Sequence, residues 1–471
     1  MLGVRVRRGC EGGLPSMVPS GGRRVPLVDL DDLGGGTALL TDQYELTMLQ
    51  AALNGGTAGR RAVFEVFARS LPNGRRYGVV AGTGRLLDAI ERFRFDGPVL
   101  EYLTSRGIVD APTARWLESY RFTGNVWGYP EGECYFPESP ILVVEGTFAE
   151  CVLLETLTLS ILNHDCAIAS AASRMAAAAQ GRPLIEMGSR RTHELAAVAA
   201  ARAAYVAGFS ATSNLEAGRL YGVPTTGTSA HAFTLLHDSE RHAFKQQLVS
   251  LGTGTTLLVD TYDVERAVRT AVELAGPDLG AVRIDSGDLG VVARRVRDQL
   301  DELGARGTRI VVTGDLDEYG IAALAAAPVD GYGVGTSLVT GSGAPTASLV
   351  YKLVERADAP GDDAPMRPVA KRSAGKPTRA GRKWAMRRLD AHGTAYAEVV
   401  TAGEPQPGPR DRVLLVPLVR DGEVVGRESL AQARERHAQR LRELPPTALQ
   451  LSRGSPAIPT EFVEAGPRPL G

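Results

Sequence analysis

The chain has 471 residues, a formal net charge of −1, 44% apolar residues and 23% charged residues. This length predicts two or three domains with a large core, and the composition is that of a soluble globular protein with no overall charge that would attract nucleic acid or a membrane. The cysteines show no CxxC or metal-type spacing, which favours a reduced, cytoplasmic setting. They are Cys10, Cys134, Cys151 and Cys166.

The first feature along the chain is a leader rich in Gly, Pro and Arg over residues 1–33. No apolar run of about seven to fifteen residues follows its arginines, so it does not resemble a secretory signal. Its composition predicts a disordered leader or a start codon assigned too early. No run of about eighteen apolar residues occurs in the sequence, so no transmembrane helix is expected; residues 196–209 come closest.

Residues 34–150 predict an N-terminal α+β domain. Its expected elements are an amphipathic helix at 41–53, a strand at 61–67, a turn and helix at 77–93, and strand-like structure at 124–144. An Ala- and Leu-rich stretch at 155–180 then predicts a long connecting helix that breaks at a glycine.

Residues 151–357 contain short apolar runs that each end in a polar, glycine-bearing turn. Such runs lie at 184–186, 256–259, 282–284, 310–312 and 331–334, with weaker candidates at 207–210 and 223–225. Their spacing, mostly about 15 to 35 residues, is typical of βα units. We therefore predict an α/β fold built on an irregular (β/α) barrel of about seven strands. An open doubly wound sheet is the alternative architecture.

Residues 358–471 predict a small C-terminal segment that packs back on the N-terminal domain. A linker rich in Pro and Asp and a basic stretch open it, and then come strands at 396–400 and 413–419 and a charged helix at 428–444. The tail from residue 452 is expected to be frayed.

Carboxylates follow two of the predicted strands. Asp260 and Asp263 follow one strand, and Asp285 and Asp288 follow the next. Strand ends share one face of a barrel, so these acids could accept hydrogen bonds from sugar hydroxyls or hold Mg²⁺ directly or through water. Helix capping is an equally good account of Asp263. Two acid pairs on one face make capping alone a poorer account of Asp260 and Asp285.

Arginines and glycines near the same strand ends predict anion binding. Arg190 and Arg191 could each bind a carboxylate or phosphate with two hydrogen bonds, although a structural salt bridge is an equal alternative for Arg191. Arg283 interrupts an apolar strand, where an unpaired charge is costly, so an anionic ligand is favoured there. Residues 331–336 are glycine-rich and run from the last predicted strand into the turn after it, a frequent phosphate site in barrels.

His231 follows a weaker strand candidate and could act as a general acid, a metal ligand or a phosphorylatable nucleophile. No second histidine stands at a metal-like spacing, which argues against zinc. His164 and His193 are expected to be structural. The remaining histidines lie among charged residues and are expected to be solvated; they are His237, His242, His392 and His437.

Several of these motifs, in this order, resemble the nicotinate phosphoribosyltransferase family, one of the type II phosphoribosyltransferases. The similarity extends over about 40–354 and returns over 371–388. The matching segments are 41–44, 187–191, 212–218, 227–231, 260–263, 283–288, 314–315 and 333–336. One segment alone would be weak, whereas the ordered set is highly specific.

The resemblance implies an enzyme of NAD salvage (the Preiss–Handler pathway) that transfers the phosphoribosyl group of phosphoribosyl pyrophosphate (PRPP) to nicotinate and releases pyrophosphate. It implies Mg²⁺ as a cofactor and ATP as a co-substrate. His231 matches the histidine that ATP phosphorylates transiently. A head-to-tail homodimer with a shared active site is also implied.

The resemblance also implies a role for each matching residue. Asp42 and Tyr44 would reach the neighbouring subunit's site, where Tyr44 stacks on the pyridine ring and Met187 lies near its other face. Asn214 would donate to the substrate's carboxylate, whereas the nicotinamide enzyme has an aspartate there. Arg190 and Arg283 would bind phosphate or pyrophosphate, and Asp260 and Asp285 would bind the ribose and Mg²⁺. The 5-phosphate would be bound by Gly314, Asp315, Gly335 and Thr336.

Three alternatives differ from this interpretation. The first is a nicotinamide or quinolinate phosphoribosyltransferase. The second is another barrel enzyme acting on sugar phosphates, such as an aldolase, but no lysine that could form a Schiff base stands at a predicted strand end. The third is a non-catalytic regulator or scaffold, which would be expected to have lost some of the acids, the arginines or His231.

Overall fold

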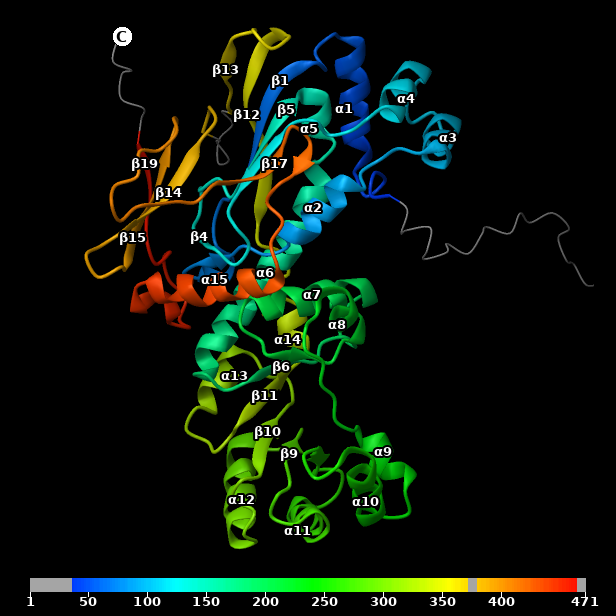
Figure 1. Cartoon of the computed structure of the whole chain (residues 1–471), viewed down its shortest axis with the longest axis vertical. Coiled ribbons are helices and arrows are strands. Elements are labelled where there is room, and N and C mark those ends of the chain that lie inside the picture. Colours follow the sequence, from blue (N-terminus) through cyan, green and yellow to red (C-terminus); the bar gives the residue numbers. More distant parts are fainter. Residues whose placement is uncertain (1–35, 372–378, 464–471) are drawn as a thin grey trace, which may run out of the picture.

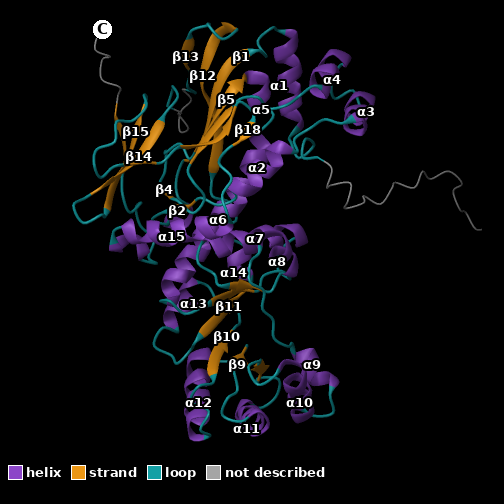
Figure 2. Ribbon diagram, in the orientation of Figure 1, coloured by secondary structure: helices purple, strands orange, loops and turns teal. Residues whose placement is uncertain are grey.

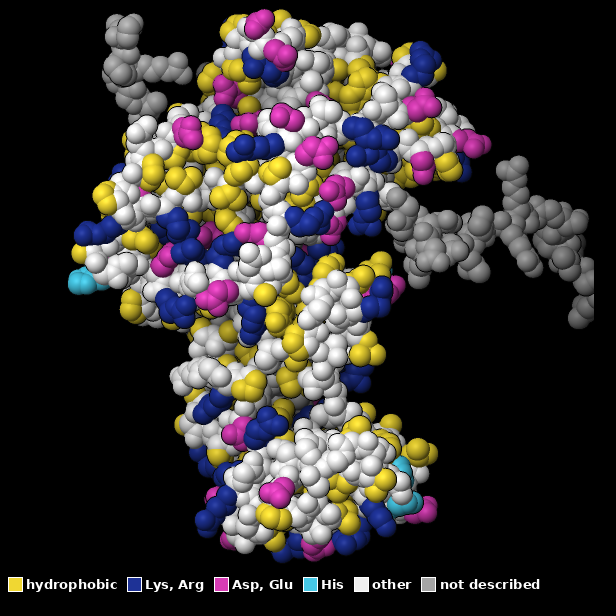
Figure 3. Space-filling model, viewed as in Figure 1, with side chains coloured by type: hydrophobic (Ala, Val, Ile, Leu, Met, Phe, Trp, Pro, Cys, Tyr) yellow, Lys and Arg dark blue, Asp and Glu magenta, His cyan; other side chains and the backbone are white. Residues whose placement is uncertain are grey.

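The computed structural model describes residues 36–371 and 379–463, so the predicted leader at 1–33 lies outside the described residues. The chain forms two lobes stacked along its long axis (Figure 1). Helix α6 (Glu155–Ala179) lies between an upper lobe rich in strands and a lower lobe of alternating strands and helices (Figure 2). Acidic and basic side chains are interspersed over the visible face of both lobes (Figure 3).

The upper lobe is built on a seven-stranded antiparallel sheet in the order β13-β12-β1-β5-β3-β17-β18. Its strands are β1 (Arg60–Ala68), β3 (Asn125–Gly128), β5 (Leu142–Thr147), β12 (Leu349–Pro360), β13 (Met366–Pro368), β17 (Val416–Arg420) and β18 (Glu423–Val424). Strand β12 falls in the range predicted for the barrel, yet it belongs to this sheet because it pairs with β1 over most of its length.

Short helices surround this sheet, and a second, two-stranded sheet joins it to α6. The helices are α1 (Gln43–Asn54), the 3₁₀ helix η2 (Pro72–Gly74), α2 (Thr83–Glu91), α3 (Gly97–Ser105), α4 (Ala111–Glu118) and α5 (Phe148–Val152). The small sheet pairs β2 (Gly78–Val79) with β4 (Cys134–Tyr135). Side chains of α1, α2 and the long strands share one buried apolar core.

The lower lobe contains a six-stranded parallel sheet in the order β7-β6-β11-β10-β9-β8. Its strands are β6 (Leu184–Glu186), β7 (Ala211–Thr212), β8 (Thr256–Leu258), β9 (Ala281–Ile284), β10 (Arg309–Val312) and β11 (Gly331–Val334). Its helices are α7 (Glu194–Val206), α8 (Leu215–Tyr221), α9 (His231–Leu236), α10 (Glu240–Leu251), α11 (Val264–Ala275), α12 (Leu289–Glu302), α13 (Glu318–Ala323) and α14 (Thr336–Val339).

The predicted α/β class is confirmed, whereas a barrel of seven strands is not. The sheet is an open half-barrel whose edge strands, β7 and β8, do not pair with each other. Residues 223–225 contribute only one bridge, between Thr225 and Thr212, and residues 226–251 then form a loop and two helices. The candidate at 207–210 is wrong because the chain turns at Gly208, with φ of +116°, and the strand begins only at residue 211.

The C-terminal segment adds a four-stranded sheet and helix α15 (Leu430–Glu443), followed by the 3₁₀ helix η3 (Pro446–Leu449). The sheet has the order β16-β14-β15-β19 and comprises β14 (Trp384–Leu389), β15 (Ala395–Thr401), β16 (Arg412–Val413) and β19 (Thr460–Val463). A frayed tail from residue 452 is wrong for the described part, because β19 pairs with β15 and Ile458 is buried.

Among the described residues, one helical stretch, 148–179, is long and apolar enough to cross a membrane by length and composition. It is not the stretch at 196–209 that the sequence singled out. In the fold, 67% of its apolar window is buried, because α6 packs between the two lobes. This helix therefore forms part of the core, as its many buried alanines indicate.

Candidate active site

A cavity of about 250 Å³ opens at the carboxyl ends of β6, β9, β10 and β11. In parallel α/β sheets this edge is where ligands bind. Eight of the thirteen residues to which the resemblance assigns a role line the cavity. The full lining is Met187, Arg190, Arg191, Arg283, Asp285, Thr313, Gly314, Asp315, Gly333, Gly335 and Thr336.

Asp260 supports the turn that carries Asp285. Its Oδ2 accepts hydrogen bonds from the backbone N–H of Asp285 at 2.8 Å and from the hydroxyl of Ser286 at 2.7 Å. Its other oxygen, Oδ1, is buried and has no partner among the described residues. Buried polar atoms in folded proteins nearly always have a partner, so this oxygen is free to receive a ligand's hydroxyl or a cation.

His231 stands beside Asp285 at the same edge. Its Nε2 lies 3.8 Å from Oδ2 of Asp285, and its Nδ1 lies 3.1 Å from the hydroxyl oxygen of Thr261. The other oxygen of Asp285 accepts a hydrogen bond from Thr313. The side chains of His231 and Asp285 are 41% and 36% exposed, so both remain accessible to a ligand.

Arg283 lies inside β9 and points into the cavity with little compensation for its charge. Its Nη1 donates to the hydroxyl of Thr228 at 2.7 Å, while its Nε is buried without a partner among the described residues. Burial lowers the pKa of Arg283, although the nearby Asp285 and Asp260 act in the opposite direction. An anion in the cavity would supply the missing partner.

Glycines allow the chain to approach closely on the far side of the cavity. A Cβ atom added to Gly333 would lie 2.5 Å from Cγ2 of Thr313 and 2.7 Å from Sδ of Met187, so a larger residue cannot fit there. Gly314 has a φ of +114°, which favours glycine. The backbone at Gly314, Asp315 and Gly335 therefore faces the cavity without bulky side chains.

Five of the thirteen residues to which the resemblance assigns a role lie outside the cavity lining. Asp260 and His231 adjoin it through Asp285, as described above, and the other three are Asn214, Asp42 and Tyr44. Asn214 is nearby and caps α8, since its Oδ1 accepts from the N–H of Ala217 at 2.9 Å and its Nδ2 donates to Ser189 at 3.0 Å. Asp42 and Tyr44 lie at α1 in the upper lobe, so one chain does not bring them to the strand ends (Figure 1). Tyr44 is 44% exposed.

Three threonines whose hydroxyl groups contact the site residues were not identified from the sequence. Thr313 and Thr261 contact Asp285 and His231, and Thr228 contacts Arg283. All three lie in segments that the sequence marked as strand-end turns or motifs. Their position at strand ends was visible in the sequence, but threonine is so common in turns that only the contacts in the structure identify its role.

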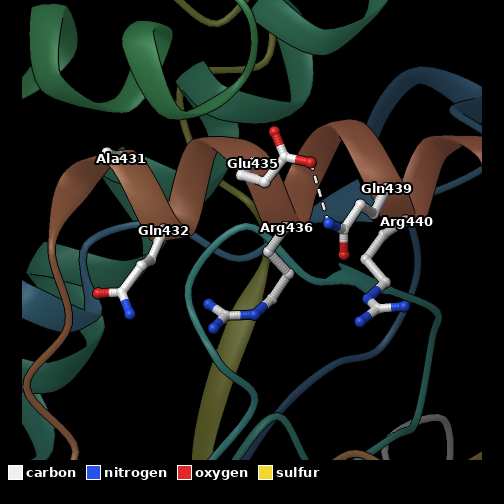
Figure 4. A pocket seen from close by; sticks show the side chains of 6 residues that line it. All are labelled: Ala431, Gln432, Glu435, Arg436, Gln439 and Arg440. Atoms are coloured by element: carbon white, nitrogen blue, oxygen red, sulfur yellow. Dashed lines mark hydrogen bonds between the residues drawn. The ribbon is translucent and has the colours of Figure 1, made fainter.

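A larger hollow of about 450 Å³ lies on the outer face of α15. Its lining side chains all come from that helix (Figure 4): Ala431, Gln432, Glu435, Arg436, Gln439 and Arg440. Glu435 accepts from Gln439, Arg436 pairs with Glu428, and Arg440 pairs with Glu443. Because these charges are paired within the protein, this hollow is a weaker candidate than the cavity.

Comparisons with known proteins identify the family to which this chain is similar. A family model described as the nicotinate phosphoribosyltransferase (NAPRTase) N-terminal domain matches residues 39–163. The nicotinate phosphoribosyltransferase pncB1 of Mycobacterium tuberculosis (strain CDC 1551 / Oshkosh) is 60% identical over 460 residues, covering 95% of this chain and 99% of that protein. The nicotinate phosphoribosyltransferase of Bacillus subtilis (strain 168) is 36% identical over 326 residues, 67% of this chain and 66% of that protein. The crystal structure of human nicotinic acid phosphoribosyltransferase matches with a TM-score of 0.77 and 26% identity, over 90% of this chain and 97% of that chain.

Proposed function

The chain belongs to the nicotinate phosphoribosyltransferase family, and from this membership we propose that the cavity at the strand ends is where it binds PRPP. Its reaction is transfer of the phosphoribosyl group from PRPP to nicotinate, a step of NAD salvage. One observation carries the placement of this reaction in the cavity. Arg283 Nε is a donor and Asp260 Oδ1 an acceptor, both buried and without a partner within residues 36–371 and 379–463, and they lie at the ends of neighbouring strands.

The charges suit the displacement of pyrophosphate from C1 of PRPP. As that bond breaks, positive charge grows on the sugar and negative charge on the leaving group. Asp260 and Asp285 would stabilise the sugar, and Arg190 and Arg283 would stabilise the pyrophosphate. The ring nitrogen of nicotinate is already nucleophilic, so the protein needs to hold it in line and does not need to supply a base.

We place the 5-phosphate of PRPP at the glycine-rich side of the cavity. Gly314, Asp315, Gly335 and Thr336 line that side, and their backbone amides can come close to phosphate oxygens. This places the two ends of PRPP against different strand ends, with the pyrophosphate toward Arg283 and the 5-phosphate toward β10 and β11.

Mg²⁺ fits the acids of the site as a partly protein-bound ion. The unpartnered Oδ1 of Asp260 is a suitable oxygen ligand, and Asp285 is the neighbouring carboxylate. No group of three or more His, Cys, Asp or Glu residues that could hold a metal occurs among residues 36–371 and 379–463, so substrate oxygens and water would complete the shell. When bound, the ion would neutralise charge on the pyrophosphate.

His231 is our candidate for coupling to ATP. With Nδ1 against Thr261, Nε2 is the nitrogen that could accept the γ-phosphoryl group of ATP, which would leave ADP. Hydrolysis would later return the phosphoryl group to water as phosphate. The phosphorylated side chain would add negative charge beside the pyrophosphate site, and we expect it to change substrate affinity more than the chemical step.

We further propose a cytoplasmic homodimer with a shared active site. Asp42 and Tyr44 are exposed at α1, away from their own chain's cavity, so a second copy would have to supply them. Partial burial and the carboxylates of Glu155 and Glu45 raise the pKa of Tyr44 to about 12, which keeps its ring neutral for stacking on nicotinate. Cys134, Cys151 and Cys166 are buried free thiols, as suits a reducing compartment.

Pyrophosphate release from PRPP tests these assignments, with nicotinate, nicotinamide or quinolinate as acceptor and with or without ATP. We expect release with nicotinate, stimulated by ATP. A His231→Ala variant should keep slow transfer and lose the stimulation. Release with nicotinamide or quinolinate in place of nicotinate would refute the substrate assignment. Equal kinetic constants with and without ATP would refute the coupling.

A further inference from the structure

A closed ring of hydrogen bonds joins the turns that follow β6 and β7, at the edge of the cavity. Glu186, the last residue of β6, accepts from the N–H of Gly188 and from the hydroxyl of Thr212, the latter at 2.5 Å. The hydroxyl oxygen of Thr212 accepts in turn from the N–H of Asn214 at 2.9 Å. Asn214 Nδ2 donates to Ser189 at 3.0 Å, and Ser189 follows Gly188 in the chain, which closes the ring.

Glu186 is not a counter-ion for the arginines of the cavity. Its side chain is fully buried, and within the described ranges no Lys, Arg or His forms an ion pair with it. Burial raises the pKa of Glu186, and the groups that act against burial are Thr212 and the N–H of Gly188, which are both neutral. A buried carboxyl group with only neutral partners is a costly way to hold two turns together. This cost points to a role for Glu186 in what those turns carry.

The turns carry Asn214, and its contacts fix which polar atom it offers to a ligand. Oδ1 already accepts from the N–H of Ala217, so rotating the amide by half a turn would set its NH₂ group against that N–H, donor against donor. The hydroxyl of Ser189 can accept or donate, so it accepts from Nδ2 in the orientation that Ala217 fixes. Nδ2 gives one hydrogen to Ser189 and keeps a second. Asn214 therefore offers a ligand a donor, while its acceptor is taken.

We propose that Glu186, Thr212 and Ser189 are positioning residues that hold Asn214 as a donor and so select a pyridine carboxylate over a carboxamide. A carboxylate accepts at both oxygens and gains a charge-assisted hydrogen bond from the free N–H. A carboxamide would bring an NH₂ group to a place where the nearest amide oxygen is already used. This inference rests on the proposed function, because it requires the pyridine ring to bind between Met187 and Asn214.

Thr212→Val tests the proposal, because it keeps the shape of the side chain and removes the hydroxyl that links Glu186 to Asn214. We expect the KM for nicotinate to rise about tenfold and the preference for nicotinate over nicotinamide in kcat/KM to fall about tenfold, as for one lost hydrogen bond of this kind. The KM for PRPP should stay within about twofold, since the hydroxyl of Thr212 bonds to Glu186 and to the N–H of Asn214 and, among the described residues, to no side chain assigned to the phosphates. Thr212→Ser, which restores the hydroxyl, should rescue both values.

Thr104→Val is the matched control, because Thr104 is exposed on α3 and bonds only to its own helix. An unchanged nicotinate KM and preference in Thr212→Val would overturn the proposal, as would an equal rise in both KM values. If Thr212→Val does not fold, Ser189→Ala removes only the contact to Nδ2 and must lower the same preference for the proposal to stand. A wild-type chain that does not use nicotinate at all would instead overturn the proposed function.

Discussion

Charged side chains gather in two regions of this molecule, and the regions differ in how the charges are compensated. Between α15 and the C-terminal sheet, Arg387 is completely buried and contacts Glu398 and, at 3.1 Å, Glu133. At the mouth of the half-barrel, Arg283 has no carboxylate partner among the described residues and Asp260 keeps one oxygen unpaired. Both regions partly remove an arginine from water, but only in the first does the arginine form direct ion pairs with carboxylates.

The pKa values reflect this difference. Burial by itself would raise the pKa of Glu133, yet Arg387 and Arg412 hold it below its usual value. Burial lowers the pKa of Arg283, and its neighbours do not reverse the effect. The comparison teaches that a compensated buried charge holds elements together, whereas an uncompensated one at a strand end marks a place for a ligand.

The largest expected effect is on the compensated region. Arg387→Met would leave Glu133 and Glu398 buried without the guanidinium between them, so the free energy of unfolding should fall by about 3–5 kcal/mol. Chemical denaturation measures this loss. Arg388→Met is the control in the same strand, because Arg388 is 34% exposed and lies 3.6 Å from Glu461, so it should lose less than about 1 kcal/mol. Equal losses in the two variants would break the comparison.

The uncompensated region should respond in the opposite way. Arg283→Ala should lower kcat/KM for PRPP by about 10²–10³-fold, because the group that stabilises the leaving pyrophosphate is gone. Its free energy of unfolding should stay within about 1 kcal/mol of the original, since no ion pair is lost. Steady-state kinetics and denaturation on the same sample separate the two effects. Arg294→Ala, at an exposed position of α12, should change neither quantity.

Helix α15, which borders the compensated region, also carries a histidine that the fold keeps uncharged. His437 is buried, its ring contacts Gly132 O at 3.1 Å and Ser173 Oγ at 3.0 Å, and burial lowers its pKa from 6.5 to about 4. The unfolded chain therefore binds a proton below pH 6.5 that the folded chain binds only near pH 4. The contribution of neutral His437 to the free energy of unfolding is therefore fully present above pH 6.5. It is lost as the pH falls from 6.5 to about 4, by about 3 kcal/mol in total.

His437→Gln should flatten this part of the pH profile. The quantity to measure is the difference in unfolding free energy between the variant and the original protein from pH 7 to pH 4. This difference removes the contribution of the carboxylic acids to the pH dependence, because they titrate in both proteins. Parallel profiles would show that His437 titrates equally in the folded and unfolded chains, contrary to its burial.

Local patterns predicted much of the fold. Helix α6 occupies Glu155–Ala179, almost the predicted range, because its alanine-rich sequence is helical at every turn. The short strand β7 was misplaced because two residues cannot carry an apolar run. The prediction that His437 is exposed to solvent was wrong, because its charged neighbours in the sequence lie on other faces of α15. Strand β19 was missed because its pairing with β15 spans some sixty residues (398 to 460) that a local pattern does not see.

The residues that line the candidate site could also be predicted in part from local patterns. Strand ends of a parallel sheet meet at one edge, so Arg283, Asp285 and Gly335 could be grouped before their distances were known. The partners of Asn214 within the protein were not predicted, because its contact with Ser189 depends on how two turns lie side by side. Sequence identifies residue types at strand ends, while side-chain partners follow only from the packed turns.

The smallest expected effect comes from Asp263, which lies three residues from Asp260 in the turn after β8. Asp263 caps α11 by accepting from the N–H of Arg266 at 2.8 Å, and it has no link to the cavity lining. Asp263→Ala should therefore lower the free energy of unfolding by about 1 kcal/mol and leave kcat/KM nearly unchanged. Asp260→Asn should do the reverse, because the unpaired Oδ1 is the atom left for substrate or metal. If Asp263→Ala reduces activity as strongly as Asp260→Asn, both acids serve the reaction and capping does not account for Asp263.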